Sequence, residues 1–276
     1  MAGGRISRGW RLVKVSWGIV KVEKSLLVLP IVSFLCLAVV WGGLIAGAVG
    51  VGGLPRSGNQ IPPVYYPFIV IGYFLASFIT IYFNAVVVGM ATIRLRGGDP
   101  SMSDGFRLAT SKIGKIIGWA ALTATVGMIL RAIEERAGFL GRIVIALVGV
   151  AWAIVTFFVV PVLLYEQLGV FASVKRSASI FKERWGEQFI GNVTIGGIMF
   201  LLSLPVIAVC GLLIVVLPPL GIALMILAIG VMIGLGGALS GVFNAALYQY
   251  ATTGEAAGAF ALEDLQGSFR PKKGRL

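Results

Sequence analysis

The sequence contains no histidine and only two cysteines, Cys36 and Cys210, among its 276 residues. Histidine is the most frequent metal ligand and the most frequent general base at neutral pH, so the side chain that many enzymes rely on is missing. Both cysteines fall inside apolar runs, where two separated thiols complete neither a zinc site nor a disulfide framework. The sequence also has no Gly-Lys-Ser/Thr phosphate loop and no serine elbow. We therefore expect no catalytic residues, no metal and no cofactor, and a protein that is not an enzyme.

Charged residues are scarce as well, at 12% of the chain against 58% hydrophobic residues, whereas soluble domains average about 25% charged residues. No charged residue lies near the middle of an apolar run, which argues against a buried proton relay. Six runs reach the ~18 residues that a helix needs to cross the membrane: residues 25–49, 66–90, 113–130, 143–164, 189–216 and 220–247. We expect an all-α integral membrane protein whose six transmembrane helices form one polytopic membrane domain over residues 1–276.

The basic residues gather on one side of this predicted topology. All but four of the 23 Lys and Arg residues lie before the first run, after the second, after the fourth or at the end of the chain; the four are Arg56, Arg131, Arg136 and Arg142. The positive-inside rule then predicts a multi-pass protein of the cytoplasmic (inner) membrane, with both termini and a tail at 254–276 in the cytoplasm. The net charge of +12 favours anionic membrane lipids over nucleic acid as partners, because the basic residues flank spans and match no nucleic-acid fold.

Short internal matches favour three repeated units. Gly9-Trp10-Arg11-Leu12 recurs as Gly105-Phe106-Arg107-Leu108, with a looser copy from Gly169. In the same way Phe83-Asn84-Ala85 recurs as Phe243-Asn244-Ala245. We expect each unit to consist of an amphipathic interfacial helix followed by a transmembrane hairpin, all in one orientation.

Two basic stretches are predicted to form helices that lie in the cytoplasmic headgroup layer. At 100° per residue, residues 1–24 place Trp10, Val13 and Trp17 on one face, and the stretch after the fourth run places Val170, Val174, Ala178 and Phe181 on one face. The residues expected to contact lipid headgroups are Arg8, Trp10, Arg11, Lys14, Trp17, Lys21, Lys175 and Arg176. Alternatively, both helices pack on the ends of their own spans and only anchor the bundle.

Small and polar residues inside the runs mark candidate positions for helix packing or for lining a path. They are Asn84, Pro205, Gly230, Gly234, Gly237, Gly241 and Asn244. The four glycines and Asn244 recur at alternating four- and three-residue steps, which puts them on one face of the last run. Pro205 should kink the fifth run. These residues either bring helices together or line a translocation path, in which a kink at Pro205 facing the glycine stripe would act as a hinge.

Two features outside the spans carry further expectations. Residues 97–101 read as a turn, after which Ser103 or Asp104 should cap the next helix. Glu166, which follows the fourth run, is the acidic residue closest to hydrocarbon. We expect it to pair with Lys175 or Arg176, and it is the candidate gate of any path.

The segment Pro161-Val162-Leu163-Leu164-Tyr165-Glu166, followed by Ala172, Ser173, Arg176, Ser177 and the 182–185 stretch, resembles a broad group of uncharacterised prokaryotic six-span membrane proteins. Arg8-Gly9-Trp10-Arg11-Leu12 and Arg96-Gly97-Gly98 fit the same group, which is similar to the membrane domain of some glycerophosphodiester phosphodiesterases. The resemblance implies an architecture and no activity, because the catalytic domain of those enzymes is absent. We expect a scaffold or accessory subunit that organises lipid or a protein partner. The alternative is a small-solute or lipid transporter (permease) that uses the repeat interface.

Overall fold

In the computed structural model the chain is described over residues 3–53, 62–185 and 191–255, with side chains described from residue 13 onward apart from 184–199 and Ala223. All regular structure in these ranges is helical. The elements are α1 (Gly3–Val22), α2 (Ser25–Gly52), the 3-10 turn η1 (Pro63–Tyr65), α3 (Tyr66–Leu95), α4 (Met102–Ser111), α5 (Ile113–Arg136), α6 (Phe139–Val155), α7 (Val159–Tyr165), α8 (Val170–Trp185), α9 (Gly191–Val216) and α10 (Pro218–Thr253).

Five segments of the described chain are long and apolar enough to cross a membrane. They are Ser25–Gly52, Pro63–Leu95, Ile113–Arg136, Phe139–Tyr165 and Pro218–Thr253, and the described apolar part of α9, Phe200–Val216, is shorter. Large apolar side chains such as Val39 and Val215 are 75% and 81% exposed, as expected where a helix faces hydrocarbon instead of water. The chain is therefore a membrane-embedded helical protein, and its sixth span stays a prediction.

The fourth predicted run, residues 143–164, does not form one continuous helix. α6 ends at Val155 and α7 begins at Val159, so three residues interrupt the segment. The span itself is confirmed, since Phe139–Tyr165 is long and apolar enough to cross a membrane. The break was not predicted, because Thr156, Phe157 and Phe158 lie within the apolar run and hydropathy carries no signal for it.

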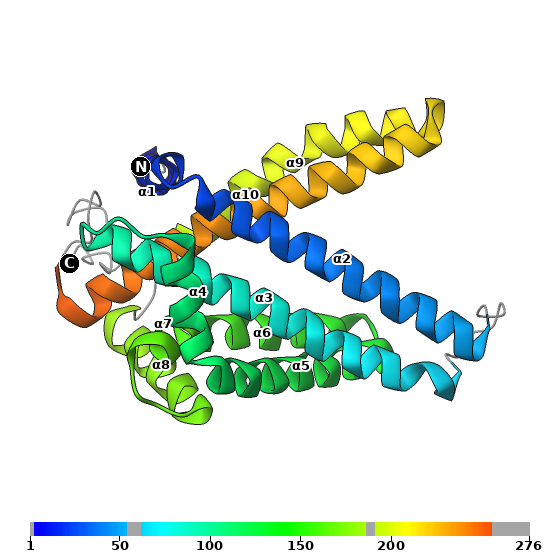
Figure 1. Cartoon of the computed structure of the whole chain (residues 1–276), viewed down its shortest axis with the longest axis horizontal. Helices are drawn as coiled ribbons and strands as arrows, with labels where there is room; N and C mark the ends of the chain where they lie inside the picture. Colours follow the sequence, from blue (N-terminus) through cyan, green and yellow to red (C-terminus); the bar gives the residue numbers. More distant parts are fainter. Residues whose placement is uncertain (1–2, 54–61, 186–190, 256–276) are drawn as a thin grey trace.

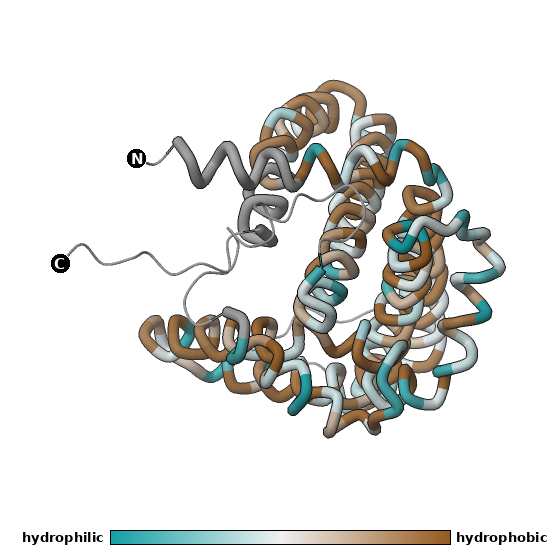
Figure 2. The backbone as a smooth tube through the Cα atoms, turned by 90° about the vertical axis from the view of Figure 1, so that its left-hand side faces the viewer, coloured by the Kyte–Doolittle hydropathy of each residue, from teal (hydrophilic) through white to brown (hydrophobic). Residues whose placement is uncertain are grey.

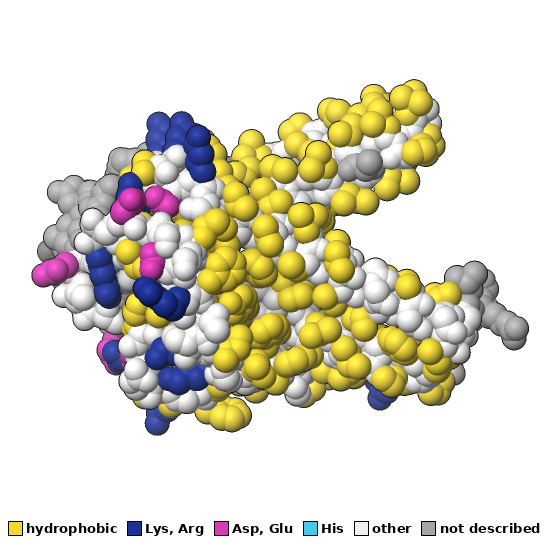
Figure 3. All heavy atoms as spheres, in the orientation of Figure 1, with side chains coloured by type: hydrophobic (Ala, Val, Ile, Leu, Met, Phe, Trp, Pro, Cys, Tyr) yellow, Lys and Arg dark blue, Asp and Glu magenta, His cyan; other side chains and the backbone are white. Residues whose placement is uncertain are grey.

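Charged side chains gather at one end of the bundle (Figure 3). α1, α4, α8 and the C-terminal end of α10 lie at this end, which we call the charged end (Figure 1). The described chain thus begins and ends on the same side of the molecule. Figure 2 looks onto this end and shows hydrophilic segments interspersed among hydrophobic helices.

The buried core lies toward the charged end, where α3, α7 and α10 meet. Its largest fully buried side chains include Phe158, Phe243, Met90 and Leu247. Away from that end the α9–α10 hairpin diverges from α2 and α3, and the space-filling view shows an open notch between them (Figures 1 and 3). The best-packed part of the bundle is therefore the part that carries the polar side chains described next.

Candidate functional site

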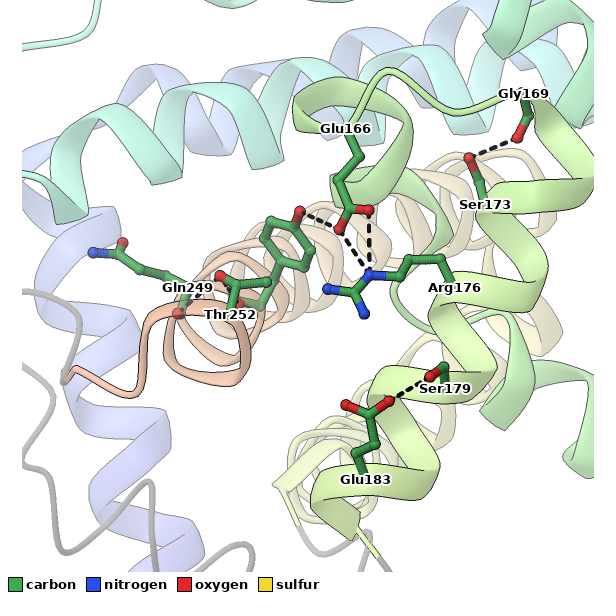
Figure 4. A network of polar contacts seen from close by, with 9 residues as sticks. Glu166, Gly169, Ser173, Arg176, Ser179, Glu183, Gln249 and Thr252 are labelled. Carbon is green, nitrogen blue, oxygen red and sulfur yellow. Dashed lines mark hydrogen bonds and ion pairs between the residues drawn. The ribbon is translucent and has the colours of Figure 1, made fainter.

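Glu166, the residue directly after α7, lies at the charged end between α8 and α10 (Figure 4). Arg176 Nε donates to both carboxylate oxygens at 3.2 Å, and the Tyr248 hydroxyl donates to Glu166 Oε1 at 3.1 Å. Lys115 Nζ of α5 donates to the Glu166 backbone oxygen at 3.4 Å. Of the two expected partners, Arg176 forms the ion pair, whereas Lys175 is exposed. Glu166 therefore joins α7 to both neighbouring helices, and its role as a gate stays a prediction.

A pocket of about 380 Å³ opens between α3, α4 and α7 at the same end of the bundle. Its lining residues are Thr92, Ile93, Arg96, Asp104, Arg107, Leu108, Ser111 and Tyr165. The Arg96 guanidinium carbon lies 5.4 Å from the centre of the Tyr165 ring, and this ring stacks on Tyr248 at 6.2 Å between centroids. The pocket therefore shares its tyrosine pair with the Glu166 contacts, and we call it the arginine pocket.

Tyr165 places a tyrosine hydroxyl at the arginine pocket. This hydroxyl is buried next to the Thr92 hydroxyl and makes no full hydrogen bond with the residues that the structure describes. The Thr92 hydroxyl in the same pocket donates to Val88 O at 2.8 Å. A buried hydroxyl beside two guanidinium groups is suited to an anionic ligand with several acceptor oxygens, because arginine binds phosphate through paired N–H donors.

α4 supplies one wall of the arginine pocket and begins with a capping box. Ser101 Oγ accepts from Asp104 N at 3.2 Å, and Asp104 Oδ2 accepts from Ser101 N at 3.1 Å. Hydrogen bonds from Ser101 hold the pKa of Asp104 below its usual range, so this carboxylate stays ionised and accepts from Arg107 Nη2 at 2.9 Å. The expected cap at Ser103 or Asp104 is wrong in position, because the extended residue that begins the helix is Ser101.

The break between α6 and α7 is held by side chains from α8 and α10. Ser177 Oγ accepts from the Phe158 N–H at 3.0 Å and donates to Val155 O at 2.6 Å. Asn244 Nδ2 donates to Phe157 O at 2.8 Å. Backbone polar groups inside a membrane must find partners within the protein, so these two side chains allow the helix to be interrupted there.

The sequence reading of α8 missed Ser177. It placed Val170, Val174 and Ala178 on the apolar face and gave the serines no role, whereas the structure buries Ser173, Ser177 and Ile180 most deeply. The four- and three-residue steps between those three residues were the available signal. Serine carries no hydrophobic signal, so the period of the apolar residues does not reveal that Ser173 and Ser177 face the core.

The glycine stripe of α10 faces α2 and α3. A Cβ added at these glycines would lie 3.0 Å from the Phe34 ring for Gly230, 3.2 Å from Ile31 for Gly234, 3.6 Å from Pro30 for Gly237 and 2.5 Å from Val87 for Gly241. The atoms nearest to these four Cβ positions all belong to α2 or α3. The Pro205 side chain, on α9, is exposed. The expectation that Pro205 faces the stripe as a hinge is wrong. The stripe packs against α2 and α3, although α9 is the helix next to α10 in the sequence.

Asn84 lines a second cavity, of about 130 Å³, between α2, α3 and α10. The other lining residues are Pro30, Ser33, Phe34, Leu37, Thr80, Phe83, Val87, Ile233 and Gly237. Asn84 and Asn244 occupy matching places in the predicted repeat, but only Asn244 has a side-chain hydrogen bond. Asn84 and Gly237 therefore line the same cavity, whereas Asn244 hydrogen-bonds the break between α6 and α7.

Only part of the expected headgroup contacts can be located. The side chains of Arg8, Trp10 and Arg11, and residues 256–276 of the predicted tail, lie outside the described residues. Lys14 and Lys21 are exposed, and Lys21 Nζ lies 5.7 Å from the centre of the Trp17 ring. Within the described ranges no three His, Cys, Asp or Glu residues lie close enough together to hold a metal ion.

Comparison with known proteins gives a family and no activity. Residues 64–258, more than half of the chain, match a family of unknown function (DUF6159). No curated protein and no solved structure matches. The likeness to the membrane domain of glycerophosphodiester phosphodiesterases stays a prediction.

Proposed function

The chain belongs to this family of unknown function, and we propose that it is a non-enzymatic scaffold or accessory subunit that binds anionic lipid headgroups at its charged end. The arginine pocket carries this proposal. It combines Arg96 and Arg107 with the buried Tyr165 hydroxyl, where the spans end and interfacial elements begin. Phospholipid phosphates lie at that level of a bilayer.

We further propose that the chain has six spans in three repeated units, with the charged end and both termini in the cytoplasm of a cell whose inner membrane it occupies. The element order supports this, since α1, α4 and α8 each precede a pair of long apolar segments. α9 is 26 residues long, enough to cross the hydrocarbon. The uneven distribution of Lys and Arg supports the orientation.

A transporter is the second candidate, and the broken segment α6–α7 favours it. Interrupted helices near the middle of a bundle are common at the substrate sites of transporters. Ser177 and Asn244 satisfy the interrupted backbone from two different helices, so movement of α8 or α10 would alter the break. In contrast, Gly237 and Gly241 of α10 pack closely against α2 and α3. This close packing favours a fixed arrangement of helices and supports the scaffold role.

The scaffold proposal is tested by lipid retention. The full chain is reconstituted in nanodiscs of phosphatidylcholine with 20% phosphatidylglycerol and released for native mass spectrometry. We expect about one phosphatidylglycerol to stay bound to the wild type and to be lost from Arg96→Gln and Arg107→Gln. Arg142→Gln, a change of an exposed arginine near the start of α6, is the matched control and should retain the lipid.

Two results would overturn the proposal. The first is equal retention of phosphatidylglycerol by the wild type and both pocket variants. The second is equal loss in Arg142→Gln, which would indicate that overall charge decides lipid retention. Proton- or solute-coupled flux in vesicles that is abolished by Asn244→Leu would favour the transporter instead.

A further inference from the structure

The cavity between α2, α3 and α10 contains polar side chains that have no partner. Most described threonines in the spans bond their own helix: Thr92, Thr123, Thr125 and Thr156 each donate to a carbonyl four residues earlier, at 2.7–2.8 Å. Thr80 makes no hydrogen bond with any residue that the structure describes. Thr80 therefore carries a free hydroxyl at the cavity.

Ser33 and Asn84 complete a group of three polar side chains around the same space. Neither side chain has a hydrogen-bond partner in the described part of the chain, and Ser33 is only 8% exposed. Thr80 and Asn84 are four residues apart on α3 and so share a face. The cavity thus combines the hydroxyl of the buried residue Ser33, a second hydroxyl and an amide, while its other lining residues are apolar.

These groups lie deep in the predicted hydrocarbon layer. At 1.5 Å per residue, Ser33 is about 12 Å along α2 from Ser25, and Asn84 is about 16 Å along α3 from Leu95. Water is not available there to satisfy an amide, and an unpaired polar group in hydrocarbon is costly. The arrangement is therefore explained by an occupant that supplies hydrogen bonds.

We propose that this cavity binds a neutral, lipid-soluble molecule through a hydroxyl or carbonyl oxygen. The occupant is neutral because no Asp, Glu, Lys or Arg lines the cavity. Phe34, Leu37, Phe83 and Ile233 surround the apolar part of the molecule. Thr80 is exposed on the bundle surface, so the ligand enters from the lipid. The site shares no lining residue with the arginine pocket and is independent of the proposed scaffold role.

The test uses an octanol that carries a photoactivatable diazirine, with the full chain in nanodiscs. Labelled peptides are identified by mass spectrometry, with 1-octanol or octane as competitor. We expect labelling of α2, α3 or α10 beside the cavity, and competition by 1-octanol but not by octane. Asn84→Leu should reduce labelling about tenfold, as expected for one lost hydrogen bond in an apolar site.

Asn244→Leu is the matched control, since Asn244 already donates to Phe157 O. It should keep the labelling but lower the melting temperature, whereas Asn84→Leu should melt no lower than the wild type without ligand. Thr80→Val, an isosteric change at an exposed position, tests the same site if Asn84→Leu does not fold. Unchanged labelling in the Asn84 and Thr80 variants, or equal competition by octane, would overturn the proposal. So would a cross-link from the cavity to a second copy of the chain.

Discussion

Replacing Ser177 by alanine tests whether the broken segment α6–α7 depends on a single hydroxyl. Ser177 is fully buried, and its Oγ bonds both Phe158 N and Val155 O across the break. Alanine removes the acceptor of one backbone group and the donor of another. A buried polar group that loses its partner costs about 1–3 kcal/mol, so we expect Ser177→Ala to lower the free energy of unfolding by about 2–4 kcal/mol.

Ser179→Ala is the control on the same helix. Ser179 Oγ donates to Glu183 Oε1 at 2.5 Å in an exposed position, and its loss should change the free energy of unfolding by less than about 0.5 kcal/mol. The assay is equilibrium unfolding of the detergent-solubilised chain by sodium dodecyl sulfate, followed by tryptophan fluorescence. Equal stability of the Ser177→Ala variant and the wild type would refute the reasoning, because the break would then not need the hydroxyl.

Three further predictions use the same protein. Gly241→Ala should lower the free energy of unfolding by about 1–3 kcal/mol in that assay, because the new Cβ would lie 2.5 Å from Val87. Gly237→Ala should leave stability unchanged or raise it, because its Cβ would lie 3.6 Å from Pro30. Equal effects of the two substitutions would contradict the observed packing. Glu166→Gln should lower the free energy of unfolding by about 0.5–1.5 kcal/mol, a modest loss because the Arg176 side chain is 39% exposed, and a double-mutant cycle with Arg176→Gln should show coupling. The pKa of Asp104 is lower in the folded state than in the unfolded state. Ionised Asp104 therefore stabilises α4 above the unfolded pKa of about 3.9, and this stabilisation is lost as the pH falls through the folded pKa. Amide exchange over residues 102–111, corrected for intrinsic rates, should show this loss of protection in the wild type and not in Asp104→Asn.

Sequence alone was sufficient for the helical class, the membrane location and most of the span positions. Apolar runs of about 20 residues have one stable form in hydrocarbon, because only a helix satisfies its backbone groups internally. The runs at 25–49, 66–90 and 220–247 accordingly lie within α2, α3 and α10. The ion pair of Glu166 was also predictable in part, because Lys175 and Arg176, nine and ten residues further along the chain, are the nearest basic residues that follow it. Which of the two forms the ion pair depends on how α8 is rotated about its axis.

Only the tertiary structure decided how each polar or small side chain is used. Asn84 and Asn244 stand in the same short motif, yet one lines a cavity and the other holds a broken helix. The break itself follows an uninterrupted apolar run and depends on Ser177, a residue of a different helix. Pro205 and the glycine stripe occupy adjacent helices but face different directions. Local sequence sets which segments are helical and apolar, whereas contacts between helices far apart in the chain determine which hydrogen bonds are made and which polar groups remain open to a ligand.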